Sequence, residues 1–171
     1  MHKHPVVSKD EWLRARQELL AREKEFTKAR DRLTEFRRDL PWEAVEKEYL
    51  FDGPRGQKTL PELFDGRSQL VVYHAMFDPS RVSPATAWTA DAACEQCSFW
   101  ADNFNGIIVH LNHRDVTMIA VSRAPYEKLS AYKNRMGWSF TWVSSENGDF
   151  NRDFGVSFTP EEVAQKRAFY N

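Results

Sequence analysis

Two short apolar runs near the middle of the chain constrain its fold more than any other feature. Leu70–His74 and Val116–Val121 are apolar almost throughout, without the alternation of a half-exposed strand. Such runs are typical of strands buried in a parallel sheet. A helix is expected from about residue 95, between the two runs, and another at 125–136, with Gly137 as its C-cap. Strand–helix–strand order of this kind predicts an α/β sandwich around a partly parallel sheet.

Shorter elements complete the predicted sandwich. Residues 48–52 indicate a strand, and the aromatic and polar residues that alternate over 138–143 indicate another. A capped helical turn is expected over 59–66, where glycine stops it. The helix from residue 95 is expected to break near Asn105-Gly106 and to continue toward residue 113. Short helices are expected at 149–154 and 160–170.

The N-terminal third predicts one long charged helix over residues 8–40. Ser8 and Glu11 form a capping box at its start, and Pro41 ends it. A narrow apolar seam recurs every seven residues, at Trp12, Leu19, Phe26, Leu33 and Leu40. This seam suits either packing on the protein's own domain or contact with a second copy, and both remain open. We expect a helical extension over 1–41 and one folded domain over 42–171.

Composition excludes several classes of protein. The 171 residues include 12 Phe, 6 Trp and 5 Tyr, which is enough to build a core, so disorder is not expected. The net charge of −1 does not favour nucleic acid or an anionic membrane as a partner. No apolar run reaches the roughly 18 residues of a membrane span, and no secretory signal follows Met1, so we expect a cytoplasmic protein. No glycine-rich nucleotide loop or dinucleotide fingerprint occurs, and no cofactor is expected.

The only two cysteines form the motif Cys94-Glu95-Gln96-Cys97. This spacing at the start of a helix is typical of thiol pairs that form a reversible disulfide. The unpaired N–H groups at the helix start favour a thiolate, so Cys94 is expected to attack and Cys97 to resolve the mixed disulfide. Glu95 opposes this effect, because a neighbouring carboxylate disfavours a second negative charge. Two half-buried thiols without turnover are the simpler alternative.

A zinc site is the other reading of the cysteine pair. His110 and His113 follow Cys97 at spacings close to a two-Cys, two-His pattern, although the last spacing is one residue short. If residues 95–113 are mostly helical, a rise of about 1.5 Å per residue separates the two pairs by roughly 20 Å. Zinc ligands must lie within about 2.3 Å of one ion. We therefore expect no metal at the site.

Several motifs together resemble known families. The stretch from Asp52 to Tyr73 is similar to the start of a peroxiredoxin or thioredoxin-like domain. Longer matching segments occur at 4–8, 40–42, 73–77, 97–104, 120–125 and 142–145. These segments resemble the bacterial thioredoxin-like family called domain of unknown function 899, and the resemblance covers nearly the whole chain.

The resemblance implies a thioredoxin-like three-layer sandwich with a long N-terminal helix, and it brings no established substrate. Family members usually continue past residue 171 through closing strands, so we expect a sheet that lacks these strands or completes them across a dimer. Pro160 precedes a charged helical segment, so we expect it to begin a helix rather than to face the cysteines as a redox-site proline. A peroxidatic role is not expected, because the residue three before Cys94 is Asp91 rather than threonine.

Other residues near the predicted site have two interpretations each. Arg123 follows a central strand and suits either an anion or thiolate partner, or a solvated surface position. His74 ends the first buried strand and is expected to be a hydrogen-bonded structural histidine. Trp88, Phe99 and Trp100 suit either an apolar collar around the cysteines or ordinary core.

The function that the sequence favours is thiol–disulfide oxidoreduction, with Cys94 and Cys97 as the catalytic residues. Its expected partners are a disulfide-containing protein or a small thiol. The competing hypothesis is a non-catalytic module of the same fold that uses its long helix for dimerisation or partner binding.

Overall fold

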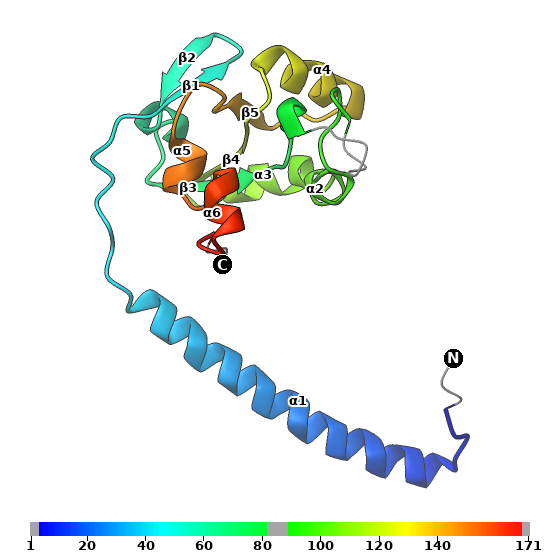
Figure 1. Cartoon of the computed structure of the whole chain (residues 1–171). Helices are drawn as coiled ribbons and strands as arrows, with labels where there is room; N and C mark the ends of the chain where they lie inside the picture. The colour runs from blue at the N-terminus through cyan, green and yellow to red at the C-terminus, as the bar shows by residue number, and fades with distance from the viewer. Residues whose placement is uncertain (1–3, 82–88, 169–171) are drawn as a thin grey trace. The chain divides into compact units, whose positions relative to one another are not determined.

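The computed structural model describes residues 4–81 and 89–168. The chain divides into two compact units, Met1–Glu46 and Lys47–Asn171. The first unit contains the helix α1, and the second contains the sheet with all remaining helices (Figure 1).

Helix α1 spans Lys9–Arg38 and confirms the predicted long helix. The Ser8 hydroxyl accepts from the Glu11 N–H at 3.3 Å, and the Glu11 carboxylate accepts from the Ser8 N–H at 3.0 Å, so the predicted capping box is present. Arg37 and Arg38 lie in the last turn, where positive side chains interact favourably with the negative end of the helix dipole. No described residue of α1 is buried.

The second unit is built on a five-stranded sheet. Its strands are β1 (Leu50–Gly53), β2 (Gly56–Thr59), β3 (Gln69–His74), β4 (Val116–Ser122) and β5 (Thr141–Ser144). Their order is β2-β1-β5-β4-β3. β4 lies parallel to both β3 and β5, whereas β1 is antiparallel to β2 and β5. The predicted mixed sheet is therefore confirmed.

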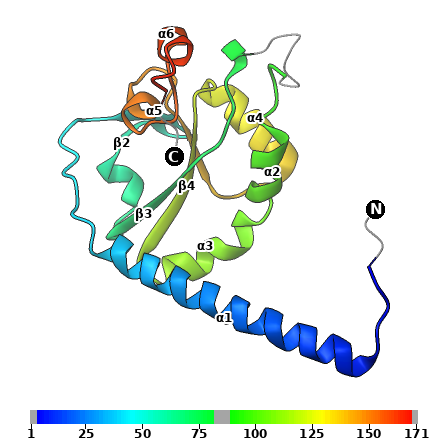
Figure 2. The same cartoon turned by 60° about the horizontal axis from the view of Figure 1, so that its bottom comes forward.

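Helices cover both faces of the sheet and make three layers (Figures 1 and 2). One face packs on α2 (Glu95–Ala101), α3 (Phe104–Asn112) and α4 (Tyr126–Met136). The other face packs on the short helix η1 (Pro61–Phe64) and on α5 (Phe150–Asp153). Leu129 anchors the first core and Phe51 the second, and both are fully buried. Burial of one such side chain contributes roughly 1.5–3 kcal/mol. The α/β sandwich predicted from the sequence is confirmed.

The two apolar runs occupy different places in the sheet. β4 is an interior strand, between β3 and β5, and is mostly buried, as predicted. β3 is parallel to β4, as predicted, but its burial was predicted wrongly. It lies at one end of the strand order, and its residues are exposed or only partly buried. A run of apolar residues shows that a strand is suited to a buried position. It does not show whether a second neighbouring strand is present.

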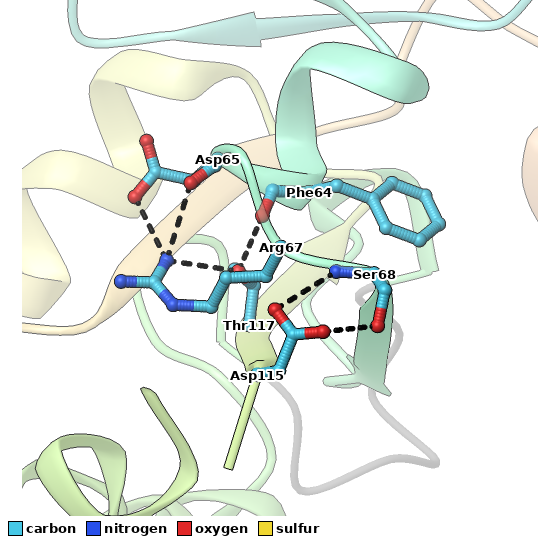
Figure 3. A network of polar contacts seen from close by, with 6 residues as sticks. All are labelled: Phe64, Asp65, Arg67, Ser68, Asp115 and Thr117. Carbon is cyan, nitrogen blue, oxygen red and sulfur yellow. Dashed lines mark hydrogen bonds and ion pairs between the residues drawn. The ribbon is translucent and has the colours of Figure 1, made fainter. Parts of the chain in front are cut away.

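A polar cluster joins the strands at the end opposite to the cysteines (Figure 3). The Arg67 guanidinium contacts both the Asp65 carboxylate and the Thr117 hydroxyl, at 3.1 Å each. The Thr117 hydroxyl donates to the Phe64 carbonyl at 2.6 Å, and the Ser68 hydroxyl donates to the Asp115 carboxylate. These bonds tie the segment before β3 to the start of β4. They hold β3 and β4 in register, so that the carboxyl ends of the two strands lie side by side at the other end of the sheet.

After β5, the described chain contains two short helices, α5 and α6 (Pro160–Ala164). Pro160 is the first residue of α6, as predicted, although α6 is shorter than the helix expected over 160–170. Thr159 caps α6 through a capping box with Glu162. No strand follows β5 within the described part of the chain. No described helix is both long and apolar enough to cross a membrane.

Candidate functional site

The cysteine pair lies where β3 and β4 end. β3 ends at His74, and the chain continues through Ala75 and Met76 before it turns away. The Ala75 N–H donates to the Val121 carbonyl at 2.9 Å, which extends the strand pairing by one residue. Ligands of open α/β sheets bind outside the carboxyl ends of the strands. The site therefore lies at the edge of the sheet where binding is expected.

The backbone of Met76 contacts both cysteines. Its carbonyl accepts from the Cys94 N–H at 2.8 Å, and its N–H donates to the Cys97 sulfur at 3.4 Å. Cys94 is the N-cap residue of α2, and Cys97 lies in its first turn. One peptide unit thus fixes the start of the helix and the second thiol together. Because these are backbone atoms, the geometry does not depend on the methionine side chain.

The two thiols have different surroundings. Both are free, with Cys94 partly exposed and Cys97 buried at 6% exposure. Burial raises the pKa of the Cys97 thiol, and hydrogen bonds from the Met76 N–H and the Tyr73 hydroxyl counter this only in part. The Cys94 thiol also hydrogen-bonds to Cys97, and this contact raises the Cys97 pKa further. The pair therefore presents one accessible thiol backed by one buried, protonated thiol.

A second set of hydrogen bonds holds α2 in place. The Ser98 hydroxyl donates to the Cys94 carbonyl at 3.0 Å, and its oxygen lies 2.8 Å from the Tyr132 hydroxyl of α4. The Trp138 indole N–H donates to the Asp102 carboxylate at the end of α2, at 2.8 Å. Since Ser98 is buried, its two hydrogen bonds form away from water, where an unpaired hydroxyl would be costly. The helix that carries the cysteines is thus attached at both ends.

Two hollows, each of about 360 Å³, meet at Met76. The first, called here the Cys94 hollow, is lined by Met76, Thr89 and residues 92–96. The second, called here the Arg123 hollow, is lined by the end of β3, by Val121 and Arg123 from the β4 segment, and by Asn151 and residues 156–158. A ligand bound at the end of β3 can therefore contact the accessible Cys94 thiol through the Cys94 hollow. It can also contact the polar and apolar residues that line the Arg123 hollow.

The structure places Arg123 and His74 in the lining of the Arg123 hollow. Arg123 is about half exposed, and its guanidinium lies 3.7 Å from the Asp78 carboxylate. The hydrogen-bonded role expected for His74 is wrong for one of its nitrogens. Its buried Nδ1 has no hydrogen-bond partner among the described residues, and its ring instead stacks on Phe150 at 5.4 Å. Burial lowers the His74 pKa, so the imidazole is neutral at physiological pH.

The aromatic residues of α2 do not form core. Phe99 and Trp100 are 68% and 61% exposed, so the interpretation of these two residues as ordinary core was wrong. Their rings contact each other edge to face at 5.9 Å. Neither lines the Cys94 hollow, so no collar over the thiols is seen there, and Trp88 lies outside the described residues.

The zinc interpretation finds no support in the described part of the chain. No group of three or more His, Cys, Asp or Glu side chains there could hold a metal ion. Residues 95–113 form two helices that break at Asp102 and Asn103, a few residues before the predicted break. His110 lies in α3 and His113 caps its end, and both are exposed.

Sequence reasoning missed the residues that support the pair: Tyr73, Met76, Ser98 and Tyr132. The sequence pattern identifies Tyr73 only as part of a strand, although a polar aromatic residue at a strand end can indicate a functional position. Met76 acts through its backbone, so no residue type could have indicated it. The Ser98–Tyr132 contact joins positions 34 residues apart, and only the fold brings them together.

Comparisons with known proteins match the chain to one family and to a solved structure. Residues 1–170 match the family described as "Bacterial protein of unknown function (DUF899)". No curated protein matches the sequence. A solved structure described as a "putative protein disulfide isomerase from Bacteroides thetaiotaomicron" is 17% identical, with a TM-score of 0.43. The similarity covers 62% of this chain and 58% of that protein.

Proposed function

The chain belongs to the bacterial family of unknown function DUF899, and we propose that it is a thiol–disulfide oxidoreductase acting through Cys94 and Cys97. The observation that carries the proposal is the shared backbone contact of both cysteines with Met76. It keeps two thiols of unequal exposure in contact at the strand ends. A pair that only filled space would not require an accessible first thiol.

The proposed reaction is two successive thiol–disulfide exchanges. The Cys94 thiolate attacks one sulfur of a substrate disulfide, a Cys94–substrate bond forms, and the other substrate sulfur leaves as a thiolate. Cys97 then loses its proton to solvent and attacks the Cys94 sulfur. The Cys94–Cys97 disulfide forms and the second substrate sulfur is released. The substrate gains two electrons from the pair, and an external dithiol reductant restores the reduced pair.

The surroundings of Cys97 suit the resolving role. Its raised pKa keeps Cys97 protonated while Cys94 reacts. When Cys94 is bound in a mixed disulfide, the neighbouring Cys97 attacks within the same molecule. Proximity of this kind makes the second step effectively unimolecular.

The test is to titrate the pair against a glutathione redox buffer and to measure disulfide reduction with a dithiol as the reductant. The wild-type chain should show a two-electron transition and turnover. Cys94→Ser should abolish both, whereas Cys97→Ser should stop at a mixed disulfide of the protein with the substrate, visible as added mass. Thr27→Ala, an exposed residue of α1 with no contact to either cysteine, is the control and should behave as wild type. Full turnover in Cys94→Ser would reject the proposal.

A second candidate function rests on α1. Its seam residues are exposed, with Phe26 at 69% and Trp12 at 58%. An uncovered apolar stripe of this length on a charged helix favours pairing with another helix. We propose dimerisation through α1 as a role that can accompany the redox function or replace it.

A further inference from the structure

A narrow cavity lies between α2 and the sheet, beside the buried thiol of Cys97. Tyr73 lines it from β3, Ala120 from β4, Trp142 from β5 and Cys97 from α2. The cavity is too narrow to hold a water molecule, and none of the described residues that line it is charged. A thiolate formed at Cys97 is therefore stabilised on this side neither by water nor by an opposite charge, and it depends on hydrogen-bond donors of the protein.

Two donors reach the Cys97 sulfur, and both come from the β3 segment rather than from α2. The Met76 N–H donates to the sulfur at 3.4 Å, and the Tyr73 hydroxyl hydrogen-bonds to the same atom. The sulfur thus has one backbone donor and one side-chain donor. Substitution can remove the side-chain donor and leave the backbone donor in place.

The other polar side chains that line the cavity have partners of their own. The Ser98 hydroxyl donates to the Cys94 carbonyl at 3.0 Å. The indole N–H groups of Trp138 and Trp142 donate to oxygen atoms of other side chains. Among the described residues that line the cavity, the Tyr73 hydroxyl is therefore the side-chain donor available to the sulfur.

Both donors are held in place by the strand that carries them. The Tyr73 ring packs edge to face on Phe104 of α3, with 5.0 Å between the ring centroids. Two residues further along, the Ala75 N–H donates to the Val121 carbonyl, and the Ala75 carbonyl accepts from the Ser122 hydroxyl. Donors that are fixed before a charge forms need little rearrangement when it appears, which is how enzymes stabilise developing anions.

We propose that Tyr73 is a catalytic residue of the second exchange, in which its hydroxyl stabilises the Cys97 thiolate together with the Met76 N–H. This inference rests on the proposed function and assigns a residue to its resolving step. The Cys97 thiol gives its proton to solvent on the side of the Cys94 hollow. The Cys97 sulfur then bonds to the Cys94 sulfur, the bond between Cys94 and the substrate breaks, and the substrate sulfur leaves as a thiolate. Tyr73 keeps its own proton throughout.

The contribution of Tyr73 belongs to the second exchange for a physical reason. A hydrogen bond to a thiolate is stronger than one to a thiol, because the acceptor is charged. An interaction that strengthens as the reaction proceeds raises its rate. In the resting pair, the contact with Cys94 opposes ionisation of Cys97. A mixed disulfide at Cys94 carries no charge, so this opposition ends after the first exchange while both donors remain.

The experiment follows both exchanges in the full chain with a small chromogenic disulfide, the symmetric disulfide of 5-thio-2-nitrobenzoate. Each exchange releases one coloured thiolate. The first phase, whose rate rises with reagent concentration, reports the attack by Cys94. The second phase, whose rate is independent of concentration, reports the attack by Cys97 within the same molecule. Stopped-flow traces from about pH 6 to about pH 10 bracket the ordinary thiol pKa of about 8.5.

Tyr73→Phe removes the hydroxyl and keeps the ring against Phe104. The second phase should slow at least about tenfold at neutral pH, because a donor to a charged group is lost. Its pH midpoint should move upward, since the remaining donor favours the thiolate less, and the first phase should stay unchanged. Tyr126→Phe makes the same change at a tyrosine that lines a hollow with Asp52 and Glu146, and it should behave as wild type.

Two further variants separate a donor to sulfur from a structural role. Tyr132→Phe removes a hydroxyl that contacts Ser98 rather than the sulfur, so the pH midpoint of the second phase should stay in place. A ring-fluorinated tyrosine at position 73 keeps the ring and makes the hydroxyl a stronger donor, so the second phase should become faster at neutral pH. This variant retains the shape of Tyr73 and tests the inference even if Tyr73→Phe fails to fold. Circular dichroism and thermal unfolding establish that each variant is folded.

A folded Tyr73→Phe variant with the wild-type second phase and pH midpoint would overturn the inference. An equal shift of the midpoint in Tyr132→Phe would also overturn it, because the effect would then come from the placement of α2. Release of only one coloured thiolate by the wild-type chain would instead reject the proposed redox function. The two failures are distinguishable, because the first requires a wild-type second phase and the other requires its absence.

Discussion

At the scale of single residues, His74 is a buried titratable group with a predictable effect on stability. Burial lowers its pKa in the folded chain, whereas the unfolded chain has the ordinary value of about 6.5. Below that pH the unfolded state binds the proton first, so the free energy of unfolding should fall as the pH decreases toward the folded pKa. His74→Phe, which keeps an aromatic ring against Phe150, should flatten this dependence.

Urea unfolding between pH 7.5 and pH 5 measures the effect, at about half-unit steps, since the relevant pKa lies below about 6.5. The control is His110→Gln, because His110 is exposed. It should retain the wild-type slope. If His74→Phe and wild type lose stability in parallel, burial of His74 is not the cause.

The cysteines should differ in reactivity. Cys94 is partly exposed, whereas Cys97 is buried and has a raised pKa. Because the thiolate is the nucleophile, iodoacetamide at neutral pH should alkylate Cys94 at least about tenfold faster. Cleavage after glutamate separates the two cysteines at Glu95, so mass spectrometry of these fragments over time measures both rates, with the fully unfolded chain as the reference. Equal rates in the folded chain would contradict the arrangement.

Residue-level prediction succeeded where side-chain identity carries the signal. The positions of Cys94 and Cys97 at the start of a helix followed from their spacing and from the apolar run before them. The contact with Met76 could not be predicted, because it uses backbone atoms whose position depends on where β3 ends. The stacking of His74 on Phe150 joins positions far apart in sequence, and only packing of α5 on the sheet creates it.

At the scale of elements, α1 carries a strong prediction of self-association. Its seam repeats every seven residues, the period that two helices share when they wind around each other. Leu19→Glu together with Phe26→Glu places charges in the middle of the seam, where Leu19 is 51% and Phe26 69% exposed. The double variant should elute as a monomer and the wild type as a dimer, measured by size exclusion with light scattering.

Leu20→Glu is the matched control for this change, since Leu20 is exposed on α1 next to the seam rather than in it. It should leave the dimer intact. A wild-type chain that is monomeric at all concentrations would reject dimerisation through α1, and so would a folded double variant that remains dimeric.

Sequence patterns identified most elements. They failed where a neighbouring strand decides whether a segment is buried or forms a strand at all. β4 and β3 have similar apolar runs, yet only β4 lies between two strands. β2 was missed, because Gly56-Gln57-Lys58-Thr59 has no apolar alternation and is a strand only through its pairing with β1. The helix N-cap at Ser8 was predicted correctly, because a capping box acts within four residues.

At the scale of the whole molecule, the division at residue 46 separates a helix without buried residues from a unit with two cores. A unit with its own cores should fold without the rest of the chain. The sheet unit contains both cysteines, Met76 and Tyr73. If the sheet unit folds alone, the proposed redox chemistry does not depend on α1 or on what α1 binds.

Residues 47–171 alone test this division. If α1 does not pack on the sheet unit, the shortened chain should melt within about 2 °C of the full chain, because a loss of 1 kcal/mol shifts the melting temperature by several degrees. Its reaction with the small chromogenic disulfide should also be unchanged. If α1 instead packs on its own domain, the deletion exposes apolar surface and the melting temperature should fall by more than about 5 °C. Measuring the full chain at several concentrations separates this effect from dimer dissociation, because only an associating chain has a melting temperature that rises with concentration.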